Sequence, residues 1–325
     1  MKALVCDAFG PLEQLSYRDF PEPVPGPGEI LIDVKAIGIN FADSLVVEGR
    51  YQAKPSVPFI PGSEVGGDIK TLGENVEGLK VGDRVFGYSD NFGAYAETIV
   101  LPVGSTKPLP DFMSYEEGAA LLAATGTAHH ALRQRGRLQA GETLVVLGAA
   151  GGTGTAAVQI GKAIGAHVIA VCSSKEKMAF AQSQGADESI DYTHEDLREA
   201  IKARTGGRGA DVVYDTVGGD AFDACSRAMA WDGRLLVVGF ASGRIPQLPV
   251  NLPLVKGYSL IGVFWGTFTQ AQPQDYAANM QELFGWIESG KVRPVIDTVF
   301  PLSDGIAALR RVAGRGAIGK VVMKP

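Results

Sequence analysis

The stretch LVVLGAAGGTGTAAVQIGKAIGAHVIAVCSS, residues 144–174, places two apolar runs on either side of a glycine cluster and one helix length of small and apolar residues. Apolar runs rich in β-branched residues are typical of buried strands, and the segment between them has the composition of a packed helix. We therefore predict a strand over 143–148, a helix over 152–165 and a second strand over 167–173.

The same alternation continues toward the C-terminus. Further elements are expected as strands over 188–191, 210–215, 233–239 and 258–264, and as helices over 175–184, 194–205 and 219–230. Alternating strands and helices must be joined by crossover connections, which favour a parallel sheet with helices on both faces. The sequence thus predicts a doubly wound α/β domain with six strands.

The residues before about 122 have a different pattern. Alternating segments such as ILIDVKAIGIN (30–40) are interrupted by proline-rich turns such as PEPVPGPGE (21–29), which is typical of antiparallel β-structure and predicts a partly closed barrel. A helical run follows from Ser114, an expected N-cap that forms a capping box with Glu117. The predicted domains are a β domain over 1–122, the α/β domain over 123–264, and a tail over 265–325, with two helices and two strands, that returns to the β domain.

Composition limits the partners and the compartment. A length of 325 residues exceeds a single core, and a net charge of −6 argues against nucleic acid or an anionic membrane surface as a partner. Three widely spaced cysteines suit neither a disulfide framework nor a structural zinc site. No signal-peptide profile and no apolar run of membrane-spanning length is found. We expect a cytoplasmic protein.

The glycine cluster AAGGTG at 149–154 lies between the first strand and the first helix of the α/β domain. We expect Gly151 to permit a tight turn, Gly152 to let the backbone approach a ligand, and Gly154 to allow close packing of helix on strand. The free N–H groups of the helix N-terminus then suit a pyrophosphate. The alternative is a tight strand–helix turn without a ligand.

The second strand ends in Ser173 and Ser174, where an NAD site usually carries a carboxylate for the ribose hydroxyls. Two hydroxyls with Lys175 and Lys177 nearby suit the 2′-phosphate of NADPH instead. Ser174 is equally suited to cap the helix that begins at residue 175, and the two roles are compatible.

With GINFADSLVVEGRY, PFIPGSEVGG, VGDRVFG, GAAGGTG and RGAIGKVV in place, the whole chain resembles the zinc-free quinone oxidoreductases, the zeta-crystallin group of the medium-chain dehydrogenase/reductase superfamily. The resemblance implies a GroES-like catalytic domain of β-barrel type built from both ends of the chain, a Rossmann domain between them, and an active site where the two meet. Zinc-dependent relatives place a cysteine at Asn40 and a histidine at Ser63, so the resemblance implies no metal site.

The resemblance also implies functional residues. Asn40, Asp43 and Tyr51 match positions that line the nicotinamide and substrate site in the family. The expected cofactor contacts are Thr127, Ala150, Gly151, Gly152, Thr153, Gly154, Ser173, Ser174, Lys177, Tyr192, Phe240, Phe264 and Arg315. The segment VFWGTF (263–268) departs from the family pattern and leaves the acceptor open.

Each candidate also has a structural interpretation. Tyr51 is either a hydrogen-bond donor to the substrate oxygen or an aromatic wall of the pocket. Asn40 is either an oriented amide in the site or a turn residue. Asp43 is either a site residue or the cap of a turn. We interpret Glu64 as fixing a backbone turn. The pair His129 and His130 is expected to be packed or solvated, because neighbouring helix positions point in different directions.

The sequence leads to the hypothesis of an NADPH-dependent reductase that passes hydride to a quinone or enone, without zinc. The alternatives are an enoyl or 2-alkenal reductase on the same scaffold and an NADPH-binding protein without catalysis. Fold resemblance cannot choose the acceptor. The apolar run GYSLIGVFW (257–265) is the expected last strand of the sheet, and pairing of its edge across a two-fold axis predicts a homodimer.

Overall fold

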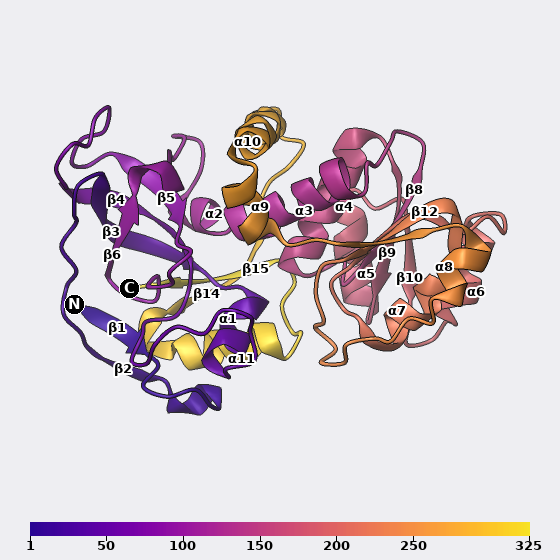
Figure 1. The fold of residues 1–325 in the computed structure, drawn as a ribbon, viewed down its shortest axis with the longest axis horizontal. Helices are drawn as coiled ribbons and strands as arrows, with labels where there is room; N and C mark the ends of the chain where they lie inside the picture. The colour runs from indigo at the N-terminus through magenta and orange to yellow at the C-terminus, as the bar shows by residue number, and fades with distance from the viewer. The chain divides into compact units, whose positions relative to one another are not determined.

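A computed structural model describes all 325 residues, Met1–Pro325, as two compact units. Unit 1 comprises Met1–Ala123 and Pro294–Pro325, and unit 2 comprises Ala124–Arg293. Unit 1 therefore joins elements from the two ends of the chain, drawn in indigo to purple and in yellow in Figure 1. No helix in either unit combines the length and the apolar character that crossing a bilayer requires.

Six strands form the sheet of unit 2, in the order β10-β9-β8-β11-β12-β13, and every neighbouring pair is parallel. The strands are β8 (Thr143–Leu147), β9 (His167–Cys172), β10 (Glu188–Asp191), β11 (Ala210–Asp215), β12 (Met229–Val237) and β13 (Ser259–Gly262). The chain proceeds outward from β8 to β10 and then restarts at β11 on the other side of β8. This is the doubly wound order of dinucleotide-binding folds, and it confirms the predicted α/β class.

The crossover helices of unit 2 are α4 (Gly152–Ile164), α5 (Lys175–Ser183), α6 (Leu197–Arg204), α7 (Gly219–Ser226) and α8 (Asn251–Lys256). Four of the five begin at or near their predicted starts, but the predicted helix over 219–230 ends at Ser226 and β12 already begins at Met229. The fifth, α8, was not predicted. Helix α4 ends where Gly165 takes a left-handed φ of 96°, a conformation that favours glycine. Helix α6 starts three residues later than the predicted 194, because Asp196 caps it by accepting the Glu199 N–H at 2.9 Å.

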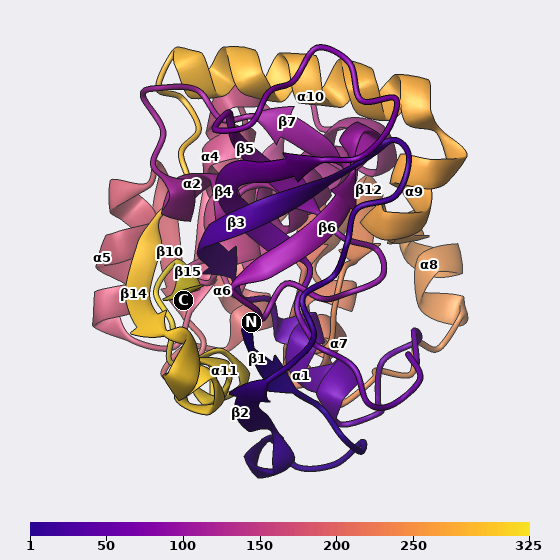
Figure 2. The ribbon, with the colours of Figure 1, turned by 90° about the vertical axis from the view of Figure 1, so that its left-hand side faces the viewer.

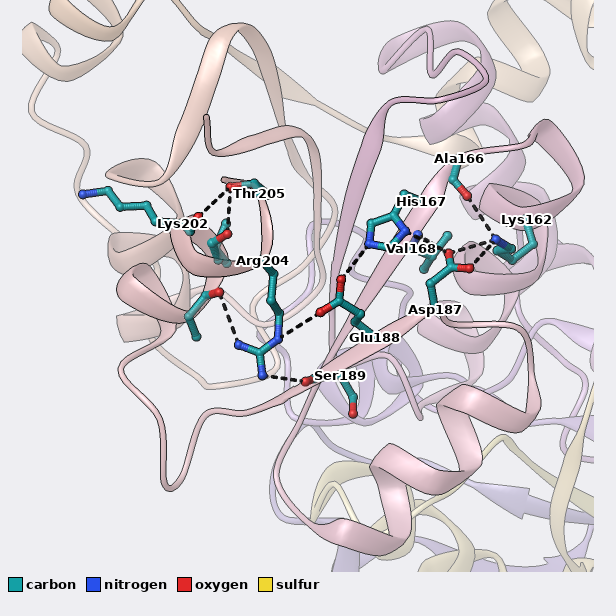
Figure 3. A network of polar contacts seen from close by, with 12 residues as sticks. Lys162, Ala166, His167, Val168, Asp187, Glu188, Ser189, Lys202, Arg204 and Thr205 are labelled. Carbon is teal, nitrogen blue, oxygen red and sulfur yellow. Dashed lines mark hydrogen bonds and ion pairs between the residues drawn. The ribbon is translucent and has the colours of Figure 1, made fainter. Parts of the chain in front are cut away.

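A polar network fixes the β9–β10 side of this sheet (Figure 3). Lys162 of α4 donates to both carboxylate oxygens of Asp187 at 2.7 and 2.8 Å, and Asp187 also accepts the Val168 N–H of β9. His167 pairs with Glu188 across the two strands at 2.9 Å. These charged groups are partly exposed, so each ion pair adds little to stability.

Unit 1 contains a sheet in the order β14-β15-β3-β4-β5-β7, with β6 paired to β3 as well. The strands are β3 (Glu29–Gly38), β4 (Glu64–Leu72), β5 (Arg84–Tyr88), β6 (Thr98–Pro102), β7 (Thr106–Pro108), β14 (Ile296–Pro301) and β15 (Lys320–Lys324). All pairs are antiparallel except β14 with β15. The predicted antiparallel β domain is confirmed, and Figure 2 shows β3 between β4 and β6.

Smaller elements complete unit 1. Strands β1 (Lys2–Val5) and β2 (Ser16–Asp19) pair antiparallel, and helices α1 (Phe41–Val47) and α11 (Gly305–Ala313) contact each other. The buried core is aliphatic and includes alternate residues of β3 such as Ile30 and Ile32. Those residues point inward because successive side chains of a strand face opposite sides.

The helical run after Ser114 begins with the predicted capping box. Ser114 accepts the Glu117 N–H at 3.2 Å, and the Glu117 carboxylate accepts the Ser114 N–H at 2.9 Å. Helix α2 (Tyr115–Ala119) lies in unit 1, and the run continues through Leu122–Gly126 into α3 (Thr127–His130) and Ala131–Arg135 of unit 2. Glycine at Gly38 lets α2 approach β3, because a Cβ there would lie 1.9 Å from the Ala119 carbonyl oxygen.

The returning tail is shorter than expected. Helices α9 (Trp265–Ala271) and α10 (Pro273–Glu288) belong to unit 2, and the chain returns to unit 1 only at Pro294. The reason lies in α3, where the His130 ring stacks on Phe268 at 3.8 Å between centroids and His129 Nε2 contacts Glu282 at 2.9 Å. Both histidines are buried, which confirms packing as their role.

Candidate active site

The glycine loop joins the end of β8 to the start of α4. Gly148 takes the left-handed φ of 66°, so the tight turn depends on Gly148 and not on Gly151, whose φ is −79°. This corrects the expectation for Gly151, which serves as the N-cap of α4. A Cβ on Gly154 would lie 2.1 Å from the Gly148 carbonyl oxygen, so only glycine permits this approach of helix to loop. The first N–H groups of α4 have no acceptor within the helix.

Ser173 and Ser174 follow β9, as predicted. Ser174 caps α5 by accepting the Lys177 N–H at 3.2 Å, which bears out the capping role. Lys177 Nζ lies 3.5 Å from the Ser173 hydroxyl, so one ammonium and one hydroxyl meet at this strand end. Tyr192 lies at the end of β10, where its N–H donates to the Cys172 carbonyl oxygen at 3.2 Å and its ring is 40% exposed.

The side chain of Cys172, the last residue of β9, contacts the glycine loop. The Cys172 thiol has its pKa raised to about 11 by burial, partly opposed by Lys177 and by a hydrogen bond from the Ala150 backbone. The thiol is therefore neutral. Its hydrogen bond from the Ala150 backbone joins the glycine loop to the end of the neighbouring strand β9.

The remaining expected cofactor residues of unit 2 follow other elements. Thr127 begins α3, Phe240 follows β12 and Phe264 follows β13. Because all six strands run parallel, the residues that follow β8, β9, β10, β12 and β13 emerge at one edge of the sheet. Ligands of doubly wound folds bind at this carboxyl edge. Arg315 belongs to unit 1, where it follows α11 with a left-handed φ of 56°.

In unit 1, Asn40 lies two residues beyond the end of β3 and is the N-cap of α1. Its Nδ2 donates to Glu64 Oε2 at 2.8 Å, and its Oδ1 accepts from Lys320 Nζ at 2.7 Å. Lys320 and Glu64 form an ion pair at 3.0 Å with side chains 5% and 1% exposed. The Asn40 amide is therefore held in one orientation, and Asn40 is at the same time the N-cap of α1, so both interpretations of this residue describe it. Glu64 holds a side-chain network instead of the simple backbone turn expected for it.

Asp43 lies in the first turn of α1 and is buried. Its Oδ2 accepts the Asn40 N–H at 2.8 Å and the Tyr95 hydroxyl at 2.7 Å. The first contact is the expected cap of a turn. The second contact joins α1 to Tyr95, one of the largest fully buried side chains of the unit.

Tyr51 follows α1, with its N–H donating to the Leu45 carbonyl oxygen at 3.1 Å, and its side chain is partly buried. Burial, with a smaller contribution from the Asp43 carboxylate, raises the pKa of Tyr51. The hydroxyl thus keeps its proton at neutral pH and remains a donor. Tyr88 of β5 has a raised pKa for the same two reasons, burial first and nearby carboxylates second.

The two positions at which the family resemblance implies zinc ligands in metal-dependent proteins hold an amide, Asn40, and a buried hydroxyl, Ser63. No group of three or more histidine, cysteine, aspartate and glutamate side chains in the chain is arranged to hold a metal ion. Zinc prefers thiolate, imidazole and carboxylate ligands, so this donor set does not suit it.

Sequence reasoning missed Lys320 and Tyr95 and gave Glu64 a different role. Lys320 was part of the quoted segment RGAIGKVV, but a lone lysine in an apolar strand is the only signal it gives. A charged residue at a strand position between valines and glycine is a sign of a buried partner, because lysine is rarely buried unless paired.

The fold and these residues define a two-domain oxidoreductase of the dinucleotide-binding class. Residues 152–285 match the family model described as zinc-binding dehydrogenase, and residues 26–111 match the alcohol dehydrogenase GroES-like domain. The chain is 37% identical over 321 residues to the quinone oxidoreductase of Pseudomonas aeruginosa, covering 98% of both chains.

Solved structures agree with this assignment. A mycobacterial protein in complex with NADPH is 33% identical with a TM-score of 0.93, and the Escherichia coli quinone oxidoreductase in complex with NADPH is 29% identical with a TM-score of 0.92. Both matches cover 100% of each chain. The present chain therefore belongs to the quinone oxidoreductase group of the zinc-binding dehydrogenase, or medium-chain dehydrogenase/reductase, family.

Proposed function

We propose that this protein is an NADPH-dependent reductase that transfers hydride to a quinone or a related electron-poor carbonyl acceptor. The observation that carries the proposal is the end of β9, where Ser173 meets the Lys177 ammonium and the two residues directly after the strand are serines, not carboxylates. A carboxylate at this place would accept the ribose hydroxyls of NADH and repel the 2′-phosphate of NADPH.

The residues of unit 2 fit a dinucleotide. The close approach that Gly154 permits brings the α4 N-terminus next to the β8 end, and helix N-termini bind pyrophosphate through free N–H groups and the helix dipole. Gly151, Gly152 and Thr153 would hold the pyrophosphate, and Ser173, Lys177 and Tyr192 the adenosine phosphate. NADPH, when bound, supplies the hydride and both electrons of the reduction.

In unit 1, Asn40 and Tyr51 would bind the acceptor. Both offer N–H or O–H donors, and a carbonyl oxygen gains negative charge as it is reduced. Tyr51 keeps its proton because its pKa is raised by burial, so it can donate to that oxygen at neutral pH. Asp43 is already bound to Tyr95 and to the Asn40 N–H, and we assign it to holding the start of α1.

The donor set at Asn40 and Ser63 supports an acceptor that reacts without a metal. A neutral amide and a hydroxyl polarise a carbonyl less than a Lewis acid does. Quinones and α,β-unsaturated carbonyls are already electron-poor and need less polarisation than a simple ketone. The proposal therefore favours these acceptors over reversible alcohol oxidation.

The test is NADPH oxidation, followed by absorbance, with a set of quinones and a matched set of 2-alkenals and acyl thioesters. We expect kcat/KM to be higher for the quinones. A reversed preference would replace the proposal by an enoyl or 2-alkenal reductase. Tight NADPH binding without turnover of any acceptor would support a non-catalytic NADPH-binding protein instead.

We also propose a homodimer formed through β13. This strand is the edge of the unit 2 sheet, and its Leu260 is 45% exposed. The adjoining helix α8 exposes Leu254 and Val255 at 81% and 74%. Exposed apolar edges are usually covered in natural proteins, and two-fold pairing of β13 would cover this one.

A cytoplasmic location is part of the same proposal. All three cysteines are buried free thiols, as is usual for proteins of a reducing compartment.

A further inference from the structure

Lys320 uses all of its hydrogen-bond donors inside unit 1. Its Nζ donates to the Ile39 carbonyl oxygen at 3.1 Å, to Asn40 Oδ1 at 2.7 Å and to Glu64 Oε2 at 3.0 Å. A protonated lysine has three donors and no acceptor. Lys320 therefore has no donor left for a ligand, and any effect it has on chemistry must pass through its neighbours.

The Asn40 amide is held at both ends by this pair. Its oxygen accepts from Lys320, and its nitrogen donates to Glu64 Oε2 at 2.8 Å. A flipped amide would place its N–H groups against the ammonium and its oxygen against the carboxylate, so the opposite charges fix the orientation. One N–H of Nδ2 remains uncommitted, and Asn40 is only partly buried.

Glu64 is fixed in turn by the backbone. Its Oε1 accepts the Ala123 N–H at 2.7 Å, while Oε2 accepts from Lys320 and Asn40. The three side chains come from β15, from β4 and from the N-cap of α1, two residues beyond the end of β3. The arrangement therefore forms only when the C-terminal strand is in place beside β3.

A buried ion pair is a weak source of stability, because desolvation of the two charges offsets their attraction. We propose that Lys320 and Glu64 are positioning residues that clamp the Asn40 amide and keep its uncommitted N–H directed to the carbonyl oxygen of the acceptor. The inference rests on the proposed function, in which Asn40 donates to that oxygen. A donor fixed before the reaction needs no reorganisation as charge develops.

The variants are chosen to avoid a lone buried charge. Lys320→Met alone would strand the Glu64 carboxylate, so the principal variant is Lys320→Met/Glu64→Gln, with Lys320→Arg as the conservative one. An exposed ion pair of the same unit, Lys35 with Asp33, provides the matched control Lys35→Met/Asp33→Asn.

We expect Lys320→Met/Glu64→Gln to lower kcat about tenfold with little change in the Kd of NADPH. Lys320→Arg, which keeps the positive charge, should lower kcat by less. In an Asn40→Ala background the same double substitution should change kcat less than about twofold, because residues that act through one group are not additive. The control should leave kcat unchanged. A double variant with parental kcat, or losses that simply add to that of Asn40→Ala, would overturn the clamp.

A second measurement does not need turnover. In ¹H–¹⁵N spectra the Asn40 side-chain amide is assigned by its loss in Asn40→Ala. Its hydrogen that is donated to Glu64 should exchange slowly in the parent and faster in Lys320→Met/Glu64→Gln. If no acceptor is reduced but this protection and its loss are observed, the proposed function fails and the clamp stands. An unprotected Asn40 amide in the parent would contradict the clamp whatever the enzyme reduces.

Discussion

The Tyr95 hydroxyl donates a 2.7 Å hydrogen bond to the Asp43 carboxylate where Tyr95 is 0% and Asp43 is 3% exposed. Burial raises the pKa of Asp43 to about 6, opposed by the bonds from the Asn40 backbone and from Tyr95. The pKa of Tyr95 is raised well above its usual range by burial and by Asp43. Tyr95 thus remains the donor, and Asp43 changes charge in the mildly acidic range.

The raised pKa of Asp43 predicts a pH dependence of stability. The folded state binds a proton more tightly than the unfolded state, so the contribution of Asp43 to the free energy of unfolding is full below about pH 4 and is lost as pH rises through about 6. Between about pH 5 and about pH 8 the parent should lose about 1–2 kcal/mol more than Asp43→Asn does.

Urea unfolding at the two pH values measures this difference. Asp215 also has its pKa raised to about 6 by burial, but it is present in both proteins and cancels in the comparison. Equal pH dependence of the parent and Asp43→Asn would show that Asp43 is ionised throughout.

Tyr51→Phe should lower kcat at least about tenfold, equivalent to about 1.4 kcal/mol, if its hydroxyl stabilises charge on the acceptor oxygen. The Kd of NADPH should change little, because this substitution is in unit 1 and the expected adenosine contacts are in unit 2. The matched control is Tyr17→Phe, which removes a hydroxyl from an exposed tyrosine of β2. A kcat within about twofold of the parent would make Tyr51 only an aromatic wall.

Ser173→Asp should remove most of a preference for NADPH over NADH that we expect to be about 10²-fold in kcat/KM. The parental preference corresponds to two charge-assisted hydrogen bonds of about 1.5–3 kcal/mol each, partly offset by desolvation. The new carboxylate should raise KM for NADPH by repelling the 2′-phosphate. Steady-state kinetics with both cofactors measures the change.

Two variants of the same region separate charge from helix capping. Ser183→Asp places the same charge at the far end of α5 and should leave the preference intact. Ser174→Ala removes the cap and should cost about 1 kcal/mol of stability. A parent that uses NADH as well as NADPH would show that the serines serve the helix alone.

Leu260→Arg should convert a dimer into a monomer, because it places a charge on the exposed edge of β13. The control is Val299→Arg, since Val299 is 44% exposed on β14, the edge strand of the other sheet. Light scattering at micromolar concentration distinguishes the two masses. A parent of monomer mass would contradict the proposed pairing.

The sheet of unit 2 can be predicted from the sequence because each of its strands is marked by residues that are contiguous in the chain. Strands such as 143–148 are continuous apolar runs, and the connections between parallel strands have one favoured hand, so alternation and order follow from sequence. The capping boxes and the loop at Gly154 are equally local. The place of α9 and α10 was not predictable, because an amphipathic helix does not specify which domain covers its apolar face.

The hydrogen bonds that join Asn40, Glu64 and Lys320 in unit 1 could not be predicted, because they too depend on tertiary contacts. Asn40 and Lys320 are 280 residues apart, and their contact depends on β15 pairing with β3. Tyr95 reaches Asp43 from 52 residues away. Tertiary partners of buried polar groups leave no periodic signal in the sequence, so Glu64 was interpreted from its neighbours in the chain alone.

We propose that this chain reduces a quinone with NADPH and without zinc. The most direct measurement is turnover of NADPH with a benzoquinone by protein whose metal content has been determined and which has then been treated with a chelator. We expect substoichiometric zinc and a kcat that survives the chelator, because an amide, Asn40, and a hydroxyl, Ser63, stand where the family resemblance implies zinc ligands. Stoichiometric zinc that is lost together with activity would contradict it.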